Sequence, residues 1–507
     1  MYFSGQTAEQ SSKRIGFGYQ SPDCSHAAQK QSYQRRQPEK TLLYQIVQNN
    51  LNTFLAQCEA EGKPAPDFVK KEFQAFLECG ILAYGFGRVR CPDCKYDGLV
   101  AFSCKRRGFC GSCMAMRQNE TAAHLVDSVI PKIPTVQWVL SLPAPLRMLV
   151  AYDSAALNFT LDTFTKTVFS WLRKKAKHKG IVDVALKAHP GGVTFIQRFG
   201  SALNLNTHFH SIFSAGVYTE SELGEMNFHV LPSPTLADIK EISTQIAKKT
   251  HKWLENLVQE QQLGDDCSEQ HDLLFACYTA SVRYQTALGP DIGRPLLRDF
   301  GEQPQGKRKD REERTVEGFN LHVSRPIGAN DRTGLERQLR YMGRPPLSDE
   351  RLTMTAQGKI SVKLKTPWSD GTSHILMTPQ DFMARLVALI PPPRKNQIRY
   401  HGVFAPNAKL RSKVVPAQAK QKEPGDATKP SSHVNSKDWA RMMARVYNID
   451  VLECPRCQSS MKMISFVTES KAIKDILTSL KMTTAPPPIA QAACVPEQGE
   501  IIYDYAA

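Results

Sequence analysis

The stretch LNLNTHFHSIFSAG, residues 203–216, decides the fold that we expect for this chain. Its alternation of polar and apolar residues is typical of a β-strand, in which successive side chains point to opposite faces. That period places His208 and His210 on one face and Phe209 on the other. Two imidazoles at this spacing can bind one divalent metal ion, while the phenyl ring anchors the strand in a core. The pattern alone leaves open the alternative, that both histidines are ordinary polar residues on a solvated face.

Segments on both sides of this strand predict an α+β fold. Short alternating runs rich in β-branched and aromatic residues indicate further strands, and apolar residues at helical spacing indicate amphipathic helices. The expected elements are strands over 135–142 and 193–199, helices over 153–179 and 235–263, mixed short strands and a charged loop over 265–320, and a short helix over 330–342. This order is that of a small palm, an antiparallel sheet with flanking helices.

The short helix carries a tyrosine that its pattern does not bury. At about 100° per residue, Leu335, Leu339 and Met342 form the apolar stripe and Tyr341 lies to one side of it. The arginines near this tyrosine in sequence are Arg337, Arg340 and Arg344. An enzyme can place a phenol among guanidinium groups as the nucleophile for a phosphodiester, because the cations stabilise the anionic transition state. The alternative is an exposed tyrosine beside solubilising charges.

Two Cys-x-x-Cys pairs predict a zinc site near the N-terminus. Cys91 and Cys94 form one pair, and Cys110 and Cys113 form the other. This spacing allows two turns to present four thiolates to one structural zinc ion, with no coordination position left for catalysis. Two other thiols nearby, Cys79 and Cys104, could replace a ligand or fill a core. We expect the neighbouring Arg106 and Arg107 to contact DNA phosphates.

A third pair, Cys454 and Cys457, supplies only half of a metal site. Its partners are not evident from spacing. It could bind zinc with a distant thiol such as Cys494, or it could be a decayed knuckle that binds no metal.

Charge and cysteine content narrow the classes of protein. The chain has 507 residues, 65 Lys and Arg against 49 Asp and Glu, and a formal net charge of +16, which favours a polyanionic partner such as DNA. It contains no apolar run long enough for a membrane span and no apolar block of a signal peptide near its start. Thirteen cysteines without an export signal fit reduced thiols and metal ligands. We therefore expect a cytosolic protein.

These motifs together resemble the IS91-like rolling-circle transposases of the HUH class, in particular their single-tyrosine branch. The stretches that carry the resemblance include FSCKRRGFCGSC, WVLSLPAPLR, VTFIQRFGSALNLNTHFHSIFSAGVY, LERQLRYMGRPPLS, RYHGVFAPNAKLR and WARMMARVYNIDVLECPRC, in consistent order over roughly residues 75–470. Founding members have two tyrosines four residues apart on this helix. Here position 337 is Arg and position 345 is Pro, so only one nucleophile is available.

The resemblance implies roles for the residues singled out above. His208 and His210 would bind Mg²⁺ or Mn²⁺, and Tyr341 would nick DNA at an element end and form a 5′-phosphotyrosine. The third metal ligand stays open, with Gln197, His322 and Asp331 as candidates. The expected partners are single-stranded or hairpin element ends and target DNA, with no membrane, in the bacterial cytoplasm near the nucleoid. The alternatives are a zinc-dependent DNA-binding regulator without catalysis and a plasmid-type replication initiator.

The domain organisation that we expect follows the motifs. An HUH palm follows a helical, zinc-ribbon-like module with four cysteine ligands, and a smaller basic region follows the palm. The expected parts are a disordered tail over 1–40, an N-terminal zinc- and DNA-binding domain over 41–130, the catalytic domain over 131–350, a basic DNA-contacting region and linker over 351–435, a helix with a Cys-x-x-Cys pair over 436–481, and a disordered tail over 482–507.

Overall fold

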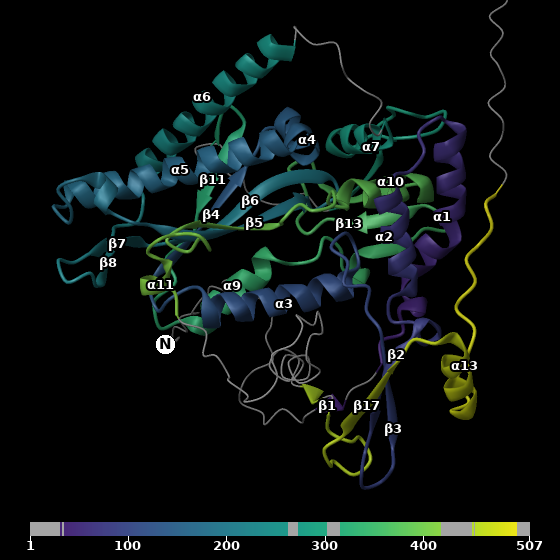
Figure 1. The fold of residues 1–507 in the computed structure, drawn as a ribbon. Helices are drawn as coiled ribbons and strands as arrows, with labels where there is room; N and C mark the ends of the chain where they lie inside the picture. Colours follow the sequence, from purple (N-terminus) through teal and green to yellow (C-terminus); the bar gives the residue numbers. More distant parts are fainter. Residues whose placement is uncertain are drawn as a thin grey trace, which may run out of the picture.

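A computed structural model describes residues 31–32, 35–261, 272–301, 315–416, 449–450 and 452–493. Most of the expected N-terminal tail, the C-terminal tail from 494 onward and the expected helix at the start of 436–481 lie outside the described residues. The fold is α+β with antiparallel sheets, as predicted (Figure 1). No helix in the described part of the chain is both long and apolar enough to cross a membrane.

The predicted palm is a sheet of six antiparallel strands. The strand order is β10-β11-β4-β6-β5-β15, so the histidine strand β6 lies near the middle. The bounds are β10 Thr315–Val316, β11 Phe319–Val323, β4 Thr135–Ser141, β6 Leu205–Ser214, β5 Gly191–Phe199 and β15 Ile398–Gly402. The edge strand β15 pairs with β5 over its whole length, so the sheet extends beyond the catalytic range 131–350 that we expected.

Each face of this sheet is covered by helices because each face is apolar. Phe209 and Phe213 of β6 are fully buried on one face, against Phe164. Ile212 faces the other side and packs in a cluster with Leu339. The first face carries α4 Ala144–Tyr152, α5 Ser154–His178 and α6 Leu236–Gln261; the second carries α3 Gly111–Ser128 and α9 Arg332–Met342 (Figure 1). A hairpin of β7 Gly216–Glu220 and β8 Met226–Val230 continues from β6.

A second sheet and four helices form the other large core. Three strands of this second sheet come from the range 351–435, which we expected to be a basic region and linker. Helix α7 lies in the range 265–320, where we expected short strands and a loop. The sheet order is β12-β13-β14-β9, with bounds β12 Leu352–Met354, β13 Ile360–Lys363, β14 Thr372–Met377 and β9 Leu297–Phe300. The helices are α1 Leu42–Ala60, α2 Asp67–Glu78, α7 Asp272–Arg283 and α10 Pro379–Leu389. Every residue of α10 from Asp381 to Leu389 is buried.

A third, smaller sheet combines the two ends of the described chain. Its order is β17-β2-β3, with bounds β17 Lys462–Val467, β2 Phe86–Arg90 and β3 Asp97–Ala101, and α13 Ser470–Ser479 packs beside it (Figure 1). A two-residue pairing of β1 Gln31–Ser32 with β16 Ile449–Asp450 adds a second contact between the ends. A further short helix in the described part of the chain is α11 Arg411–Val414.

Candidate active site and thiolate clusters

The histidine pair lies on the face of β6 that α9 covers. His208 and His210 are 8% and 5% exposed, and their ring centroids are 4.8 Å apart. Burial lowers the pKa of His208 to about 4 and that of His210 well below its usual value. Both rings are therefore neutral at physiological pH, which is the state in which an imidazole offers a lone pair to a metal.

In each of the two rings Nδ1 is hydrogen-bonded to the protein, and Nε2 is the nitrogen that could bind a ligand. His208 Nδ1 lies 2.6 Å from the carbonyl oxygen of Asn206, which fixes the proton on Nδ1 and the lone pair on Nε2. His210 Nδ1 lies 2.9 Å from the Gln137 amide nitrogen, and His210 Nε2 is buried without a hydrogen-bond partner. A half-turn of the Gln137 amide, which exchanges its nitrogen and oxygen, would let Nδ1 donate and leave the lone pair on Nε2 for a ligand. Two neutral imidazoles with such nitrogens fit a divalent cation.

The candidates for a third ligand occupy different places. Gln197 is paired across strands with His208; its amide nitrogen donates to the Met342 carbonyl oxygen, and its Oε1 is buried without a partner. His322 is in register with the β4 residue opposite His210, so it lies on the same face. Asp331 instead caps the start of α9 by accepting from Gly334 N at 2.8 Å, about 15 Å of helix away from Tyr341. The structure thus argues against Asp331.

The tyrosine of α9 faces the histidine pair. Leu335, Leu339 and Met342 are buried, as the stripe predicts, and Tyr341 is 40% exposed. Its ring stands edge-on to that of His210, with centroids 6.2 Å apart. Because the stripe turns toward the sheet and the helix ends at Met342, the last turn of α9 holds the phenol over the face of the sheet that carries Gln197 and His210. The phenol is accessible from solvent and close to a candidate metal-binding group.

The cations around the phenol differ from those expected. Arg344 lies over the ring at 4.2 Å from its centroid, and Lys365 approaches from the segment after β13, with Nζ 3.3 Å from the hydroxyl. Arg340 instead pairs with Glu336, and Arg337 is exposed. Of the three arginines expected beside the tyrosine, Arg344 is thus the one that contacts its ring, and Arg340 is held in an i,i+4 pair; the DNA-binding role of all three stays a prediction. No local pattern pointed to Lys365, because it reaches the phenol only through the packing of the second sheet.

These cations change the acidity of the tyrosine. Burial by itself raises the pKa of the Tyr341 phenol, but the charges of Arg344 and Lys365 and the hydrogen bond from Lys365 outweigh it, so the pKa lies below its usual value. A larger fraction of phenolate is the property that an oxygen nucleophile needs.

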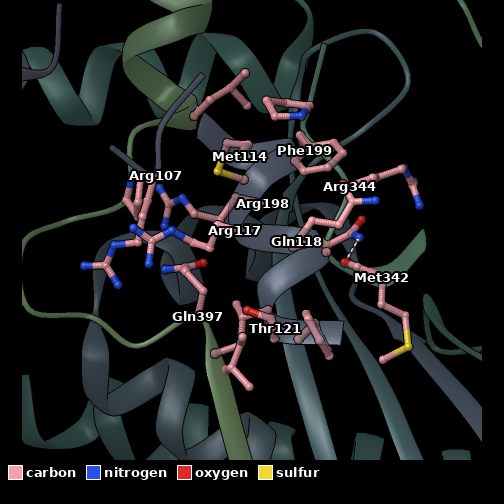
Figure 2. Close-up of a pocket in the computed structure, with 18 of the residues that line it drawn as sticks. Arg107, Met114, Arg117, Gln118, Thr121, Arg198, Phe199, Met342, Arg344 and Gln397 are labelled. Atoms are coloured by element: carbon pink, nitrogen blue, oxygen red, sulfur yellow. Dashed lines mark hydrogen bonds between the residues drawn. The ribbon is translucent and has the colours of Figure 1, made fainter. Parts of the chain in front are cut away.

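A cavity of about 90 Å³ opens beside the same turn of α9. Figure 2 shows that its walls combine arginines with apolar side chains such as Met114 and Phe199. The arginines come from both the N-terminal module and the palm, and are Arg107, Arg117, Arg198 and Arg344. Of the two arginines expected to meet DNA from the N-terminal module, Arg107 thus lines this cavity, whereas Arg106 lies 4.0 Å from the Glu72 carboxylate.

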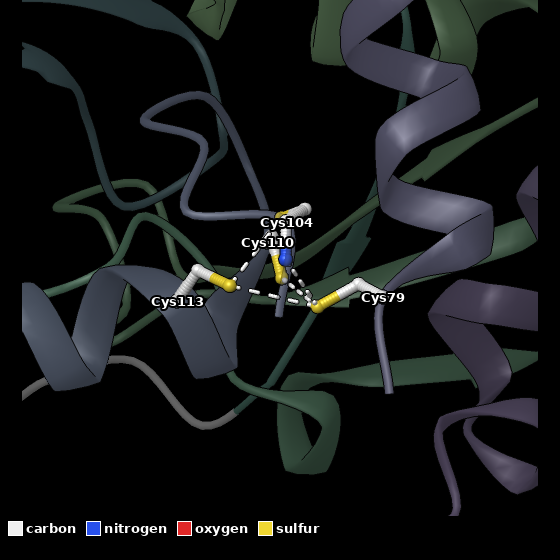
Figure 3. Close-up of side chains that lie close together, drawn as sticks. All are labelled: Cys79, Cys104, Cys110 and Cys113. Carbon is white, nitrogen blue, oxygen red and sulfur yellow. Dashed lines mark hydrogen bonds between the residues drawn. The ribbon is translucent and has the colours of Figure 1, made fainter. Parts of the chain in front are cut away.

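The first thiolate cluster differs from the predicted one. It consists of Cys79 at the end of α2, Cys104 in the loop between β3 and α3, and Cys110 and Cys113 at the start of α3 (Figure 3). The Sγ atoms of Cys79 and Cys113 are 3.5 Å apart, those of Cys104 and Cys113 are 3.3 Å apart, and those of Cys110 and Cys79 are 3.7 Å apart. The two thiols that we regarded as spare therefore complete this site.

The other predicted ligands belong to a second cluster. Cys91 and Cys94 lie with Cys454 and Cys457, and the four ligand atoms are within 4.8 Å of one another. The prediction that one zinc joins Cys91, Cys94, Cys110 and Cys113 is wrong, because β2 carries the first pair away from α3. Among the described residues, these two clusters are the groups of three or more His, Cys, Asp or Glu with metal-binding spacing.

The geometry of the first cluster fits a structural zinc ion. Tetrahedral zinc with Zn–S bonds of about 2.3 Å has S···S edges of about 3.8 Å, slightly longer than the separations between these thiols. Four thiolates leave no open position, so the ion would contribute folding free energy rather than catalysis. Its place at the junction of α2 and α3 orients α3, which packs directly on α9. The cluster thereby supports the helix that carries Tyr341.

Comparisons with known families agree with this architecture. Residues 46–142 match the transposase zinc-binding domain of the IS91 type, and residues 191–412 match the transposase family Y2_Tnp. The first range contains the cluster of Cys79, Cys104, Cys110 and Cys113, and the second contains the histidine pair and Tyr341. Comparison with curated proteins and with solved structures gives no match. Because the two matches together cover more than half of the chain, the first including its zinc module and the second most of its palm, the protein belongs to the IS91 family of transposases.

Proposed function

We propose that this transposase nicks single-stranded DNA at the ends of its element through Tyr341 and joins strands through a 5′-phosphotyrosine. The observation that carries the proposal is the contact of the Tyr341 ring with His210 on one side and with Arg344 and Lys365 on the other. A nucleophile, a candidate metal-binding pair and two cations thus meet at one accessible point.

The chemistry assigns a role to each group. Lys365 and Arg344 stabilise the Tyr341 phenolate, whose proton passes to water. The phenolate oxygen attacks the scissile phosphorus, and as the new P–O bond forms the bond to the 3′ oxygen breaks. The leaving 3′ oxygen takes a proton and becomes a free 3′-OH. Attack of a 3′-OH on the phosphotyrosine reverses these steps and transfers the strand.

The histidine pair would hold Mg²⁺ or Mn²⁺ in this scheme. Such an ion, when bound, polarises a non-bridging oxygen of the scissile phosphate as a Lewis acid. Gln137 orients His210, and the Asn206 carbonyl orients His208. We also propose Gln197 as a polar group that completes the cation's surroundings, since its Oε1 is buried without a hydrogen-bond partner.

We propose that the cavity beside α9 binds the DNA strand next to the nick. Its arginines can bind phosphates and its apolar side chains can contact a nucleobase, and a single DNA strand offers both groups. Since Arg107 and Arg117 come from the zinc module and Arg344 from the palm, a strand bound there would touch both units.

The experiment that tests the proposal is incubation of the full-length protein with labelled single-stranded element-end DNA and Mn²⁺, followed by a denaturing gel. A covalent DNA–protein band is expected, together with a free 3′ end on the released fragment. Unchanged DNA that is bound but not attached would instead favour the DNA-binding regulator.

Lys365→Met is expected to slow nicking on the order of 10²-fold at saturating DNA, because it removes one preorganised donor to the reacting oxygen. The single-turnover rate of adduct formation measures this effect. Lys363→Met is the matched control, since Lys363 is an exposed lysine two residues earlier on β13. Equal rates for both variants would show that Lys365 does not act on the phenol.

Arg117→Ala is expected to weaken binding of single-stranded element ends at physiological salt. The exposed Arg117 guanidinium lines the cavity, so its loss removes about one phosphate contact and lowers the slope of log Kd against log salt by about 0.7. A salt titration by fluorescence anisotropy gives that slope. Lys166→Ala, on the exposed side of α5 across the sheet, is the control and should leave the slope unchanged.

A further inference from the structure

The second thiolate cluster is built from two turns of the same design. Both have the sequence Cys-Pro-x-Cys followed by a residue in the left-handed region, Lys95 with φ 60° in one and Gln458 with φ 60° in the other. In each turn the backbone N–H of the first cysteine bonds the carbonyl five residues on, to Tyr96 at 2.9 Å and to Ser459 at 2.8 Å. A Cys-x-x-Cys turn closed in this way directs both thiols to the same side.

The thiols of the two turns lie as close together as the ligands of one zinc ion. Cys91 Sγ is 3.4 Å from Cys457 Sγ, and Cys94 Sγ is 3.4 Å from Cys454 Sγ. These separations are far longer than a disulfide bond of about 2.05 Å and close to the S···S edge of about 3.8 Å in a zinc tetrathiolate. The thiols of each turn thus pair with thiols of the other turn, as the ligands of a single ion do.

The surroundings of the cluster join the two ends of the chain. Strand β17 pairs antiparallel with β2, from Lys462 opposite Arg90 to Val467 opposite Phe86. Cys91 and Cys454 are buried in one small apolar cluster, and the Arg456 guanidinium lies 5.1 Å from the centre of the Tyr96 ring. A second small apolar cluster, in which Val467, Ile473 and Leu477 pack against Leu82 and Phe86, also joins these segments. Both clusters bury little apolar surface, so a metal link between segments separated by 360 residues would strengthen their attachment.

We propose that Cys91, Cys94, Cys454 and Cys457 bind a second structural zinc ion that fastens the C-terminal segment 452–482 to the N-terminal zinc module. The module would then be assembled from both ends of the chain. Neither family match includes this partner segment, since they end at residues 142 and 412. The proposal does not depend on nicking by Tyr341, and it can fail while that function stands.

The two zinc sites differ in their access to solvent, which allows them to be told apart. Cys457 is exposed, whereas Cys79, Cys110 and Cys113 of the first cluster are buried. A chelator therefore reaches the second ion first. Its loss should free β17 from β2 and leave the junction of α2 and α3 intact.

Metal analysis of the full-length protein tests the stoichiometry. Two zinc ions per chain are expected in the wild type, one in the Cys454→Ser, Cys457→Ser double variant, and two in Cys494→Ser. The Cys494 variant is the matched control, because Cys494 is the other C-terminal thiol and lies outside the described residues. One ion in the wild type, or two in the double variant, would overturn the proposal.

Hydrogen exchange on the wild-type protein provides a measurement that does not depend on the double variant folding. During slow removal of zinc by a chelator, release of the first equivalent should coincide with loss of amide protection in β2 and β17, while the start of α3 stays protected. If protection in β17 were unchanged after one equivalent had left, the second cluster would not hold the two ends together.

Discussion

Replacing Tyr341 by Phe is expected to abolish the covalent DNA adduct while leaving DNA binding within about twofold of wild type. The change removes only the attacking oxygen, so no P–O bond to the protein can form. The hydroxyl accepts a hydrogen bond from Lys365 at 3.3 Å, and the side chain is 40% exposed, so we expect a cost in stability of about 1 kcal/mol. Adduct yield on a denaturing gel and binding by anisotropy separate the two effects.

Tyr400→Phe is the control for this substitution. Tyr400 lies on the edge strand β15 and packs against the same apolar cluster as the stripe of α9. The Tyr400 variant should form the adduct at the wild-type rate. An adduct formed by the Tyr341 variant would remove Tyr341 from the mechanism and direct attention to another hydroxyl.

Loss of the histidine pair should have an effect of similar size by a different route. His208→Ala and His210→Ala are each expected to bring nicking below detection, and EDTA should do the same to the wild type until Mn²⁺ is restored. The variants remove ligands of the proposed Lewis acid and leave the nucleophile in place. Nicking assays with a metal titration measure the loss and its reversal.

His401→Gln provides a matched control for the histidine variants. His401 is on β15, its Nε2 lies 2.9 Å from Thr194 Oγ1, and burial lowers its pKa to about 4, as for His208. It packs near Phe213, on the face of the sheet away from α9. The His401 variant should therefore keep metal-dependent nicking at temperatures well below its melting point. Nicking that persisted in EDTA would show that the His208 and His210 rings are bystanders.

Local pattern was enough to predict the parts of the site that lie within single elements. The alternation of residues 203–216 placed His208 and His210 opposite Phe209, and the helical stripe of Leu335 and Leu339 left Tyr341 off the core; the structure has both arrangements. These features follow from periods of 2 and 3.6 residues, which the backbone imposes before any tertiary contact forms.

Contacts between distant segments could not be read from the sequence in the same way. The turn at Cys91 and Cys94 is evident from its spacing, but its partner is chosen by the pairing of β17 with β2, which no spacing reports. Lys365 reaches Tyr341 because the second sheet packs near α9. Strand β15 belongs to the palm although it follows Tyr341 in the sequence by more than fifty residues. In each case a non-local contact between elements decides the site.

Because its ligands come from segments far apart in the sequence, the second thiolate cluster can be completed only late in synthesis. Cys94 leaves the ribosome long before Cys454, which lies 360 residues further on. At about 5–20 residues per second, that interval is roughly 20–70 s of synthesis. During this time the palm with Tyr341 and the first cluster can fold, while Cys91 and Cys94 have no partner thiols from the C-terminal segment. A chain that terminates before Cys454 never receives the other two thiols, so the cluster can form only in chains translated past Cys457.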